Sequence, residues 1–227
     1  MRIRTWVCAL VVSVATAGVA AADDAPGWGG WYGGAYGGYI FGDFQAEDPD
    51  HFETTGDFDD DGAMAGIYVG RRSQKANRTV IGFELTLPLF MEKGTAVDKE
   101  FYPDLVTYEG DPKLGAFGGV QVGKAMGSTL PYLFASVGVV SGEGKTFNVD
   151  ENDAYSPGFV QSATATHFAW QAGAGLDCRA GAAWLIGARA AYFQATKADY
   201  TMPWNRPGPN KFGLNAVQVQ FNVGRQF

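Results

Sequence analysis

The residues that could carry out acid–base chemistry in this chain are few. Its two histidines, His51 and His167, are the only candidate general bases with a pKa near neutral. His167 is accompanied by hydroxyl groups on Ser162, Thr164 and Thr166. Residues 167–178 alternate between polar and apolar, however, and His167 falls on the small and polar face of that pattern. We therefore predict no catalytic residue.

Two charged residues occupy inward positions of other alternating segments. Glu84 lies among the polar positions of residues 79–90, and Arg189 lies on the small and polar face of residues 183–194. Each follows the start of its segment by a few residues. An unpaired buried charge is costly, so we predict that Glu84 and Arg189 pair with each other and that the pair has a structural role.

A dense acidic stretch precedes residue 62. Asp57, Asp59, Asp61 and Gly62 imitate the start of a calcium loop, but its twelfth position is Tyr68 instead of a bidentate glutamate. We predict no dedicated metal site and no cofactor; weak binding of divalent cations stays open. The stretch consists of Glu47, Asp48, Asp50, Glu53, Asp57, Asp59, Asp60 and Asp61.

The elements that must position these residues are β-strands. A period of two, with one continuous apolar face, indicates strands in eight segments: residues 31–44, 63–72, 79–90, 114–124, 131–141, 167–178, 183–194 and 213–227. In the last, Val217 to Phe227 alternate apolar residues with amides and glycine, and no later segment could cover the apolar face. This pattern suits a strand with lipid on one side and a narrow wet interior on the other.

The connections between these strands alternate in length. Residues 73–78, 125–130 and 179–182 are short, whereas residues 45–62, 91–113, 142–166 and 195–212 are long. A soluble sandwich has no reason to sort its loops in this way. We therefore predict an all-β fold, an eight-stranded antiparallel up-and-down transmembrane β-barrel with short periplasmic turns and four long extracellular loops.

The N-terminus predicts export. Arg2 and Arg4 precede an apolar run and a group of small residues ending at Ala22, which is typical of a cleaved signal peptide over residues 1–22. Residues 23–29 would form a short periplasmic segment and residues 30–227 the barrel. Cys178 would then be the only cysteine left, so no intramolecular disulfide is expected.

Charge and aromatic residues add two expectations. Without the signal peptide, 15 Lys and Arg face 24 Asp and Glu, a net charge of −9 that makes nucleic acid a poor partner. A basic cluster at one short turn is expected to be solvated, although it could contact periplasmic components: Arg71, Arg72, Lys75 and Arg78. Two interfacial aromatic rings are predicted, one from Trp31, Tyr32, Trp184 and Phe227 and the other from Phe41, Phe90, Phe168 and Trp170.

Four segments resemble one known family. They are GWYGGAYGG (residues 30–38), VIGFE (80–84), LPY followed by GV (130–132 and 138–139) and WQAGAGLD (170–177). The chain resembles the small, porin-like outer-membrane β-barrel proteins of Gram-negative bacteria over its whole mature length. It departs from them at Gln121, where arginine is frequent, and at Arg225, where an aromatic or apolar residue is more usual.

The resemblance implies an outer-membrane location, with membrane lipids and lipopolysaccharide as neighbours. It also implies that the outer-membrane insertion machinery recognises the last strand, with Phe221, Val223 and Phe227 as the assembly signal. We expect a non-enzymatic protein with a plugged interior that contributes to envelope structure and surface presentation.

Two other functions stay open. One is adhesion, or binding of a ligand such as haem or a host factor, through loop aromatics: Tyr155, Phe159, Tyr200 and Trp204. The other is a barrel enzyme that modifies lipid A. Such an enzyme needs its nucleophile at the lipid face, away from which His167 is expected to point.

Overall fold

The computed structural model describes residues 27–47, 56–91, 94–98, 105–149, 160–201 and 210–227. Among these residues no helix is long and apolar enough to cross a membrane. The described residues form nine strands: β1 (Gly30–Glu47), β2 (Gly56–Gln74), β3 (Thr79–Phe90), β4 (Gly94–Asp98), β5 (Leu105–Lys124), β6 (Thr129–Val149), β7 (Gln161–Ala180), β8 (Trp184–Tyr200) and β9 (Asn210–Gln226).

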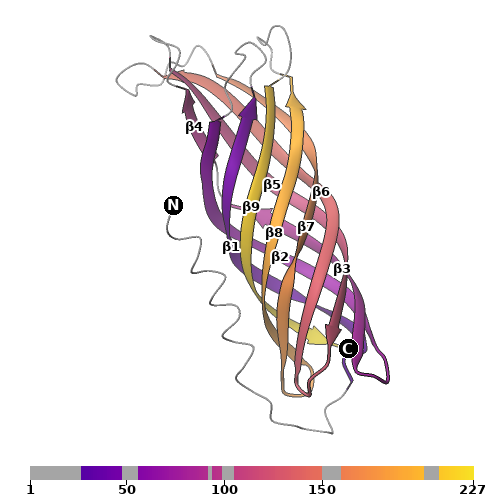
Figure 1. The fold of residues 1–227 in the computed structure, drawn as a ribbon. Coiled ribbons are helices and arrows are strands. Elements are labelled where there is room, and N and C mark those ends of the chain that lie inside the picture. Colours follow the sequence, from indigo (N-terminus) through magenta and orange to yellow (C-terminus); the bar gives the residue numbers. More distant parts are fainter. Residues whose placement is uncertain (1–26, 48–55, 92–93, 99–104, 150–159, 202–209) are drawn as a thin grey trace.

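Eight of these strands close into a barrel, which confirms the predicted fold (Figure 1). Neighbouring strands are antiparallel, β3 pairs with β5, and β9 pairs with β1 along nearly its whole length, from Tyr32 opposite Gln226 to Glu47 opposite Lys211. The short strand β4 was not predicted. It pairs with the outer part of β5, from Gly94 opposite Gly110 to Asp98 opposite Val106, as an addition to the eight-stranded ring.

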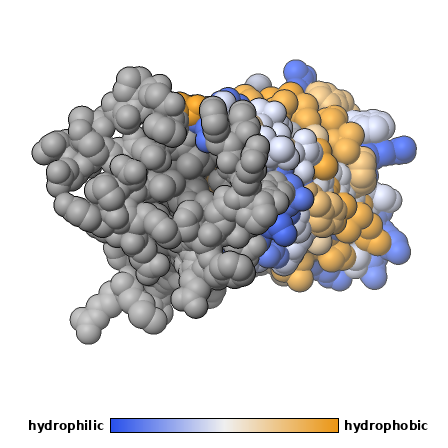
Figure 2. Space-filling view, turned by 90° about the horizontal axis from the view of Figure 1, so that it is seen from above, coloured by the Kyte–Doolittle hydropathy of each residue, from blue (hydrophilic) through white to orange (hydrophobic). Residues whose placement is uncertain are grey.

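The outward face of the barrel is an apolar belt. In β3, Ile81, Phe83, Leu85, Leu87 and Leu89 are all exposed, while the residues between them are buried or half-buried. The period of two therefore assigned the faces of this strand correctly. Figure 2 shows the belt in orange, with hydrophilic residues on both sides of it.

The strands extend well beyond the predicted segments at one end of the barrel. β2 begins at Gly56 instead of residue 63, and β6 runs to Val149 instead of residue 141. Much of the predicted long connections is thus paired sheet. The backbone ladder continues past the belt because hydrogen bonding does not require an apolar face, whereas side-chain alternation fades once both faces meet water.

Charged residues of β5 and β6 pair with each other in this extension. Lys145 Nζ lies 3.3 Å from Glu109 Oε1, and Lys113 Nζ lies 2.6 Å from Glu143 Oε2. The hydrogen bond that Lys113 donates to Glu143 raises the pKa of its ammonium group. At the other end, called the short-turn end here, residues 75–78, 125–128 and 181–183 connect the strands, close to the predicted turns.

The aromatic rings were predicted in part wrongly. Trp31, Trp184 and Phe227 are exposed at the short-turn end, and Phe41 and Phe168 are exposed toward the other. Trp170 is half-buried and donates to Gln194. Tyr32 and Phe90, in contrast, point into the barrel and are buried. Each has the parity of the inward residues of its strand, which overrides the preference of aromatic residues for membrane interfaces.

Candidate functional site

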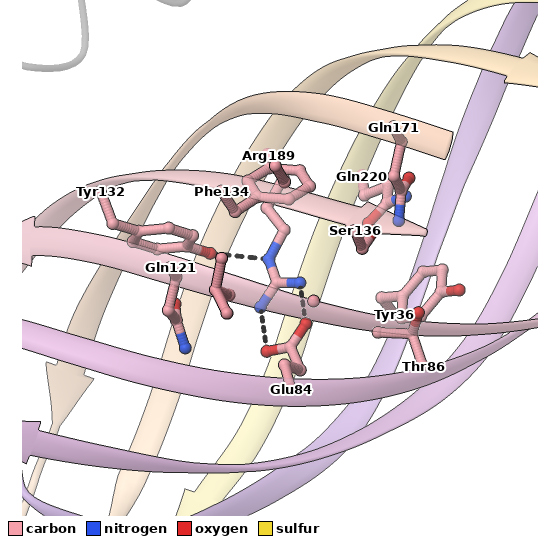
Figure 3. A pocket seen from close by; sticks show the side chains of 13 residues that line it. Tyr36, Glu84, Thr86, Gln121, Tyr132, Phe134, Ser136, Gln171, Arg189 and Gln220 are labelled. Carbon is pink, nitrogen blue, oxygen red and sulfur yellow. Dashed lines mark hydrogen bonds and ion pairs between the residues drawn. The ribbon is translucent and has the colours of Figure 1, made fainter. Parts of the chain in front are cut away.

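The barrel interior brings Glu84 of β3 and Arg189 of β8 together in a two-pronged ion pair. Arg189 Nη1 donates to Glu84 Oε1 at 2.5 Å, and Nη2 donates to Oε2 at 2.8 Å (Figure 3). The two side chains are 11% and 5% exposed, so both charges are largely removed from water. Parallel N–H donors facing both carboxylate oxygens form the strongest geometry of an arginine–carboxylate pair.

Tyrosines and an amide fix this pair in place. Tyr132 Oη accepts from Arg189 Nε at 2.6 Å, and Tyr32 donates its hydroxyl to Glu84 at 2.8 Å. Gln121 in turn donates to the Tyr32 oxygen. The Glu84 carboxylate and the Arg189 guanidinium thus each have a further hydrogen-bond partner on a different strand. These hydrogen bonds restrict the orientation of both side chains.

Glycines on neighbouring strands make room for the two tyrosine rings. A Cβ on Gly70 would lie 2.5 Å from the hydroxyl oxygen of Tyr32, and one on Gly175 would lie 2.5 Å from Cζ of Tyr132. Real Cβ atoms do not approach other atoms so closely. The glycine content of these strands thus follows from the need to fit large inward side chains into a narrow barrel.

A second buried ion pair, which the sequence analysis missed, lies nearer the short-turn end. Arg72 Nη2 donates to Asp177 Oδ2 at 2.5 Å, and both side chains are 2% exposed. The prediction that Arg72 is solvated at a turn is therefore wrong. Its parity within β2, shared with Gly66, Tyr68 and Gly70, is the signal that would have placed it inside.

Gln121 occupies the position where an arginine was expected. Its Oε1 accepts from Arg72 Nη2 at 3.1 Å, while its amide nitrogen donates to Tyr32. The amide therefore links the two ion pairs without adding a third positive charge to the interior. Arg72 reaches the same region from β2 and lies 4.2 Å from the centroid of the Tyr32 ring.

Trp28 closes the barrel at the short-turn end, although it precedes the first strand. It is 1% exposed, its indole nitrogen donates to the Gly127 carbonyl at 3.1 Å, and its backbone nitrogen donates to Gln74. The guanidinium carbon of Arg179 lies 4.6 Å from the Trp28 ring centroid, and that of Arg72 lies 5.8 Å from it. These hydrogen bonds and cation–π contacts fix the Trp28 side chain across the short-turn end of the barrel interior.

Little empty space remains above the Glu84–Arg189 pair. A cavity of about 20 Å³ is lined by Ser136, Gln171 and Gln220, among others shown in Figure 3. This is about the space of one water molecule. Ser136 Oγ is buried there without a hydrogen-bond partner among the described residues. The cavity is a water site in size, and it is too small for an organic ligand.

An apolar layer separates this polar interior from the far end. Phe90 and Phe117 both pack against Phe193, with ring centroids 5.9 Å and 6.0 Å from that of Phe193. Ile40 and Leu214 belong to the same buried cluster. This apolar layer lies on the side of the ion pairs that faces away from the short-turn end.

His167 lies at the far rim of the interior and has both ring nitrogens engaged. Nδ1 is 2.8 Å from the Thr196 carbonyl oxygen, and Nε2 is 2.6 Å from the Tyr200 hydroxyl. A carbonyl can only accept, so in the neutral ring Nδ1 donates and Nε2 accepts from Tyr200. Tyr200 also packs against Phe212 at 4.8 Å, and burial raises the pKa of its phenol.

The other predicted site residues are distributed as follows. Phe221, Val223 and Phe227 are exposed on the outer face of β9 and just beyond it. Asp57 and Asp59–61 belong to β2, whereas His51 and three of the acidic residues fall outside the described part of the chain. Within the described part, no group of three or more His, Cys, Asp or Glu could hold a metal ion.

The fold and its filled interior can now be compared with known proteins. The model of the outer membrane protein beta-barrel domain family matches residues 7–227. The chain belongs to this family. It is therefore an outer-membrane protein, as predicted, and the short-turn end of its barrel is the periplasmic end. No curated protein matches the chain.

Several solved structures of outer-membrane barrels are similar. OprG from Pseudomonas aeruginosa has a TM-score of 0.52 at 13% identity, covering 90% of this chain and 99% of its own. Ail, the attachment invasion locus protein of Yersinia pestis, has a TM-score of 0.36 at 12% identity, with coverages of 86% and 99%. Neisserial surface protein A has a TM-score of 0.34 at 12% identity, again with 86% and 99%. At these identities OprG supports the fold alone.

We predict that Glu84→Gln destabilises the barrel by about 3–5 kcal/mol, because it leaves the Arg189 charge buried without its counter-ion. The measurement is urea-induced unfolding of the refolded protein in lipid vesicles, followed by tryptophan fluorescence. In the double variant Glu84→Gln/Arg189→Met most of this loss should disappear, since both buried charges are gone.

The matched control is Lys113→Gln, which removes one charge of an exposed ion pair and should leave the unfolding midpoint unchanged. If Glu84→Gln unfolds like the wild type, the pair does not hold the interior together.

Proposed function

We propose that this protein is a non-enzymatic structural component of the outer membrane, with an interior closed to solutes. The observation that carries the proposal is the occupancy of the interior by two buried ion pairs, with a cavity of about 20 Å³ beside the Glu84–Arg189 pair. An eight-stranded barrel is just wide enough for its side chains. A rigid, plugged barrel contributes stiffness and a surface to the envelope instead of a diffusion path.

Two further layers support a closed interior. Trp28 covers the periplasmic mouth, and the phenylalanine layer around Phe193 lies between the polar network and the extracellular rim. An ion crossing the barrel would have to displace a charged pair and then pass an apolar layer. Both steps oppose steady conduction.

The surroundings of His167 argue against lipid A chemistry. Its ring points into the barrel, and both nitrogens already have partners in Thr196 and Tyr200. A base that acts on a membrane lipid must reach the outer face of the sheet. His167 is therefore better explained as a residue that packs the extracellular rim.

Adhesion or ligand binding through the extracellular loops is the alternative function. Tyr155, Phe159 and Trp204 lie outside the described residues, and Tyr200 is buried against His167 and Phe212. Tyr200 is thus a packing residue, and no contact among the described residues favours this alternative.

In a planar lipid bilayer, the refolded protein should form no stable channel. The double variant Glu84→Ala/Arg189→Ala removes two long side chains from the interior and should leak small ions, provided that its barrel still folds. Single-channel recording at moderate voltage measures both. A large, steady conductance of the wild-type protein would refute the closed interior.

We also propose that Phe221, Val223 and Phe227 form the signal read by the outer-membrane insertion machinery. Phe227 is 74% exposed, and its backbone nitrogen, which donates to the Trp31 carbonyl, is what attaches it to the sheet. The variant Phe227→Ala should therefore refold in vitro like the wild type but give severalfold less folded barrel in cells, measured by heat-modifiable gel mobility.

Phe83→Ala is the matched control, because it removes another exposed phenylalanine from the lipid face away from the terminus. Equal losses in both variants in cells would show that general membrane contact, and not a terminal signal, explains the effect.

A further inference from the structure

A basic and apolar groove lies at the periplasmic end of the barrel, on a side that the proposed function does not use. It has a volume of about 1150 Å³ and is open to the surroundings. Its lining combines outward apolar side chains, those of Trp31, Ile81, Phe83 and Val120, with three cationic residues. Of these, Arg72 is paired with Asp177, which leaves Arg71 and Lys75.

The strand register places Arg71 inside the apolar belt. Trp31, Arg71, Phe83 and Val120 stand directly opposite one another on β1, β2, β3 and β5 and form one row on the outer face. In the next row toward the periplasm, Ser73 of β2 lies opposite Ile81 of β3, which lies opposite Val122 of β5. Arg71 therefore has apolar side chains beside it in its own row, and the polar Ser73 follows it toward the periplasm.

A guanidinium in this position needs a counter-charge or access to the headgroup layer. Its guanidinium carbon lies 5.8 Å from the centroid of the Trp31 ring, a contact that orients the side chain without neutralising it. Among the described residues no carboxylate forms an ion pair with Arg71 or Lys75. The groove thus offers positive charge to an external anion.

The charge distribution of the whole barrel points to the same kind of ligand. Glu84 and Asp177 face the interior, each paired with an arginine, and the other described acidic residues lie at the extracellular end. The outward charges near the periplasmic turns are basic: Arg71, Lys75, Arg78, Lys124 and Arg225. An anion bound at this end meets no opposing Asp or Glu side chain on the outer surface described.

We propose that this groove binds an anionic glycerophospholipid of the periplasmic leaflet. Arg71 and Lys75 hold the phosphate, with the planar guanidinium donating two parallel hydrogen bonds, and the acyl chains lie along Ile81, Phe83 and Val120. Trp31 borders the site at the depth where indole rings prefer to lie. Lipopolysaccharide is not the occupant, because its headgroup belongs to the leaflet at the other end of the barrel.

Native mass spectrometry of the full-length protein in mild detergent tests this, with phosphatidylglycerol and zwitterionic phosphatidylcholine of the same acyl chains as probes. The wild-type protein should retain phosphatidylglycerol preferentially. The variant Arg71→Gln/Lys75→Gln should bind it about tenfold more weakly, which corresponds to about 1.4 kcal/mol. Heat-modifiable mobility verifies that each variant is folded.

Arg225→Gln is the matched control, since Arg225 is exposed at the same end and on the same face but does not line the groove. It should bind like the wild type. Equal retention of both lipids, unchanged binding by the Arg71/Lys75 variant, or an equal loss in Arg225→Gln would overturn the proposal. Retention of lipopolysaccharide that depends on Arg71 and Lys75 would also overturn it. None of these results depends on whether the interior conducts ions.

Discussion

The structure depends on the closure of the sheet, because a backbone in lipid has no water to satisfy its hydrogen-bonding groups. The pairings of β1 with β9 and of β3 with β5 close the ring of eight strands. With only eight strands, closure also makes the interior so narrow that side chains fill it. Any charge on an inward position is then desolvated and must find its partner inside the same barrel. The Glu84–Arg189 and Arg72–Asp177 pairs are the consequence of that constraint.

Closure also explains why the interior is divided along its length. Around the ion pairs, Tyr32, Tyr132 and Gln121 supply hydrogen bonds, and glycines on neighbouring strands leave space for the tyrosine rings. Farther toward the cell exterior, aromatic rings such as Phe193 fill the same narrow space by contact alone. Hydrogen-bonded polar groups need partners at fixed distances, whereas apolar side chains only have to fill the available space. The polar network and the aromatic layer lie at different heights in the barrel.

Alternation along each strand predicted most of this from the sequence, because one parity decides which side chains face inward. It placed Glu84 and Arg189 inside and the β3 leucines outside, and the sorted connections predicted eight strands. Errors arose where residue type was given more weight than parity. Arg72 was assigned to a turn, and Tyr32 and Phe90 to the membrane interface, although all three have inward parity. The partner of Arg72 could not be predicted, since the tilt of the strands decides which levels meet across the barrel. The extracellular ends of the strands were not predicted, because backbone pairing continues beyond the residues that alternate between apolar and polar.

The same parity gives the outer surface its own electrostatics. Inside, Arg72 and Arg189 are each paired with a carboxylate. Outside, Arg71 shares its row with Trp31, Phe83 and Val120, and no side chain on that row can cancel its charge. A barrel cannot rotate an outward residue inward without shifting the register of the whole strand. The charge of Arg71 therefore stays on the outer face, where the anionic lipid proposed for the periplasmic leaflet is within reach of this end of β2.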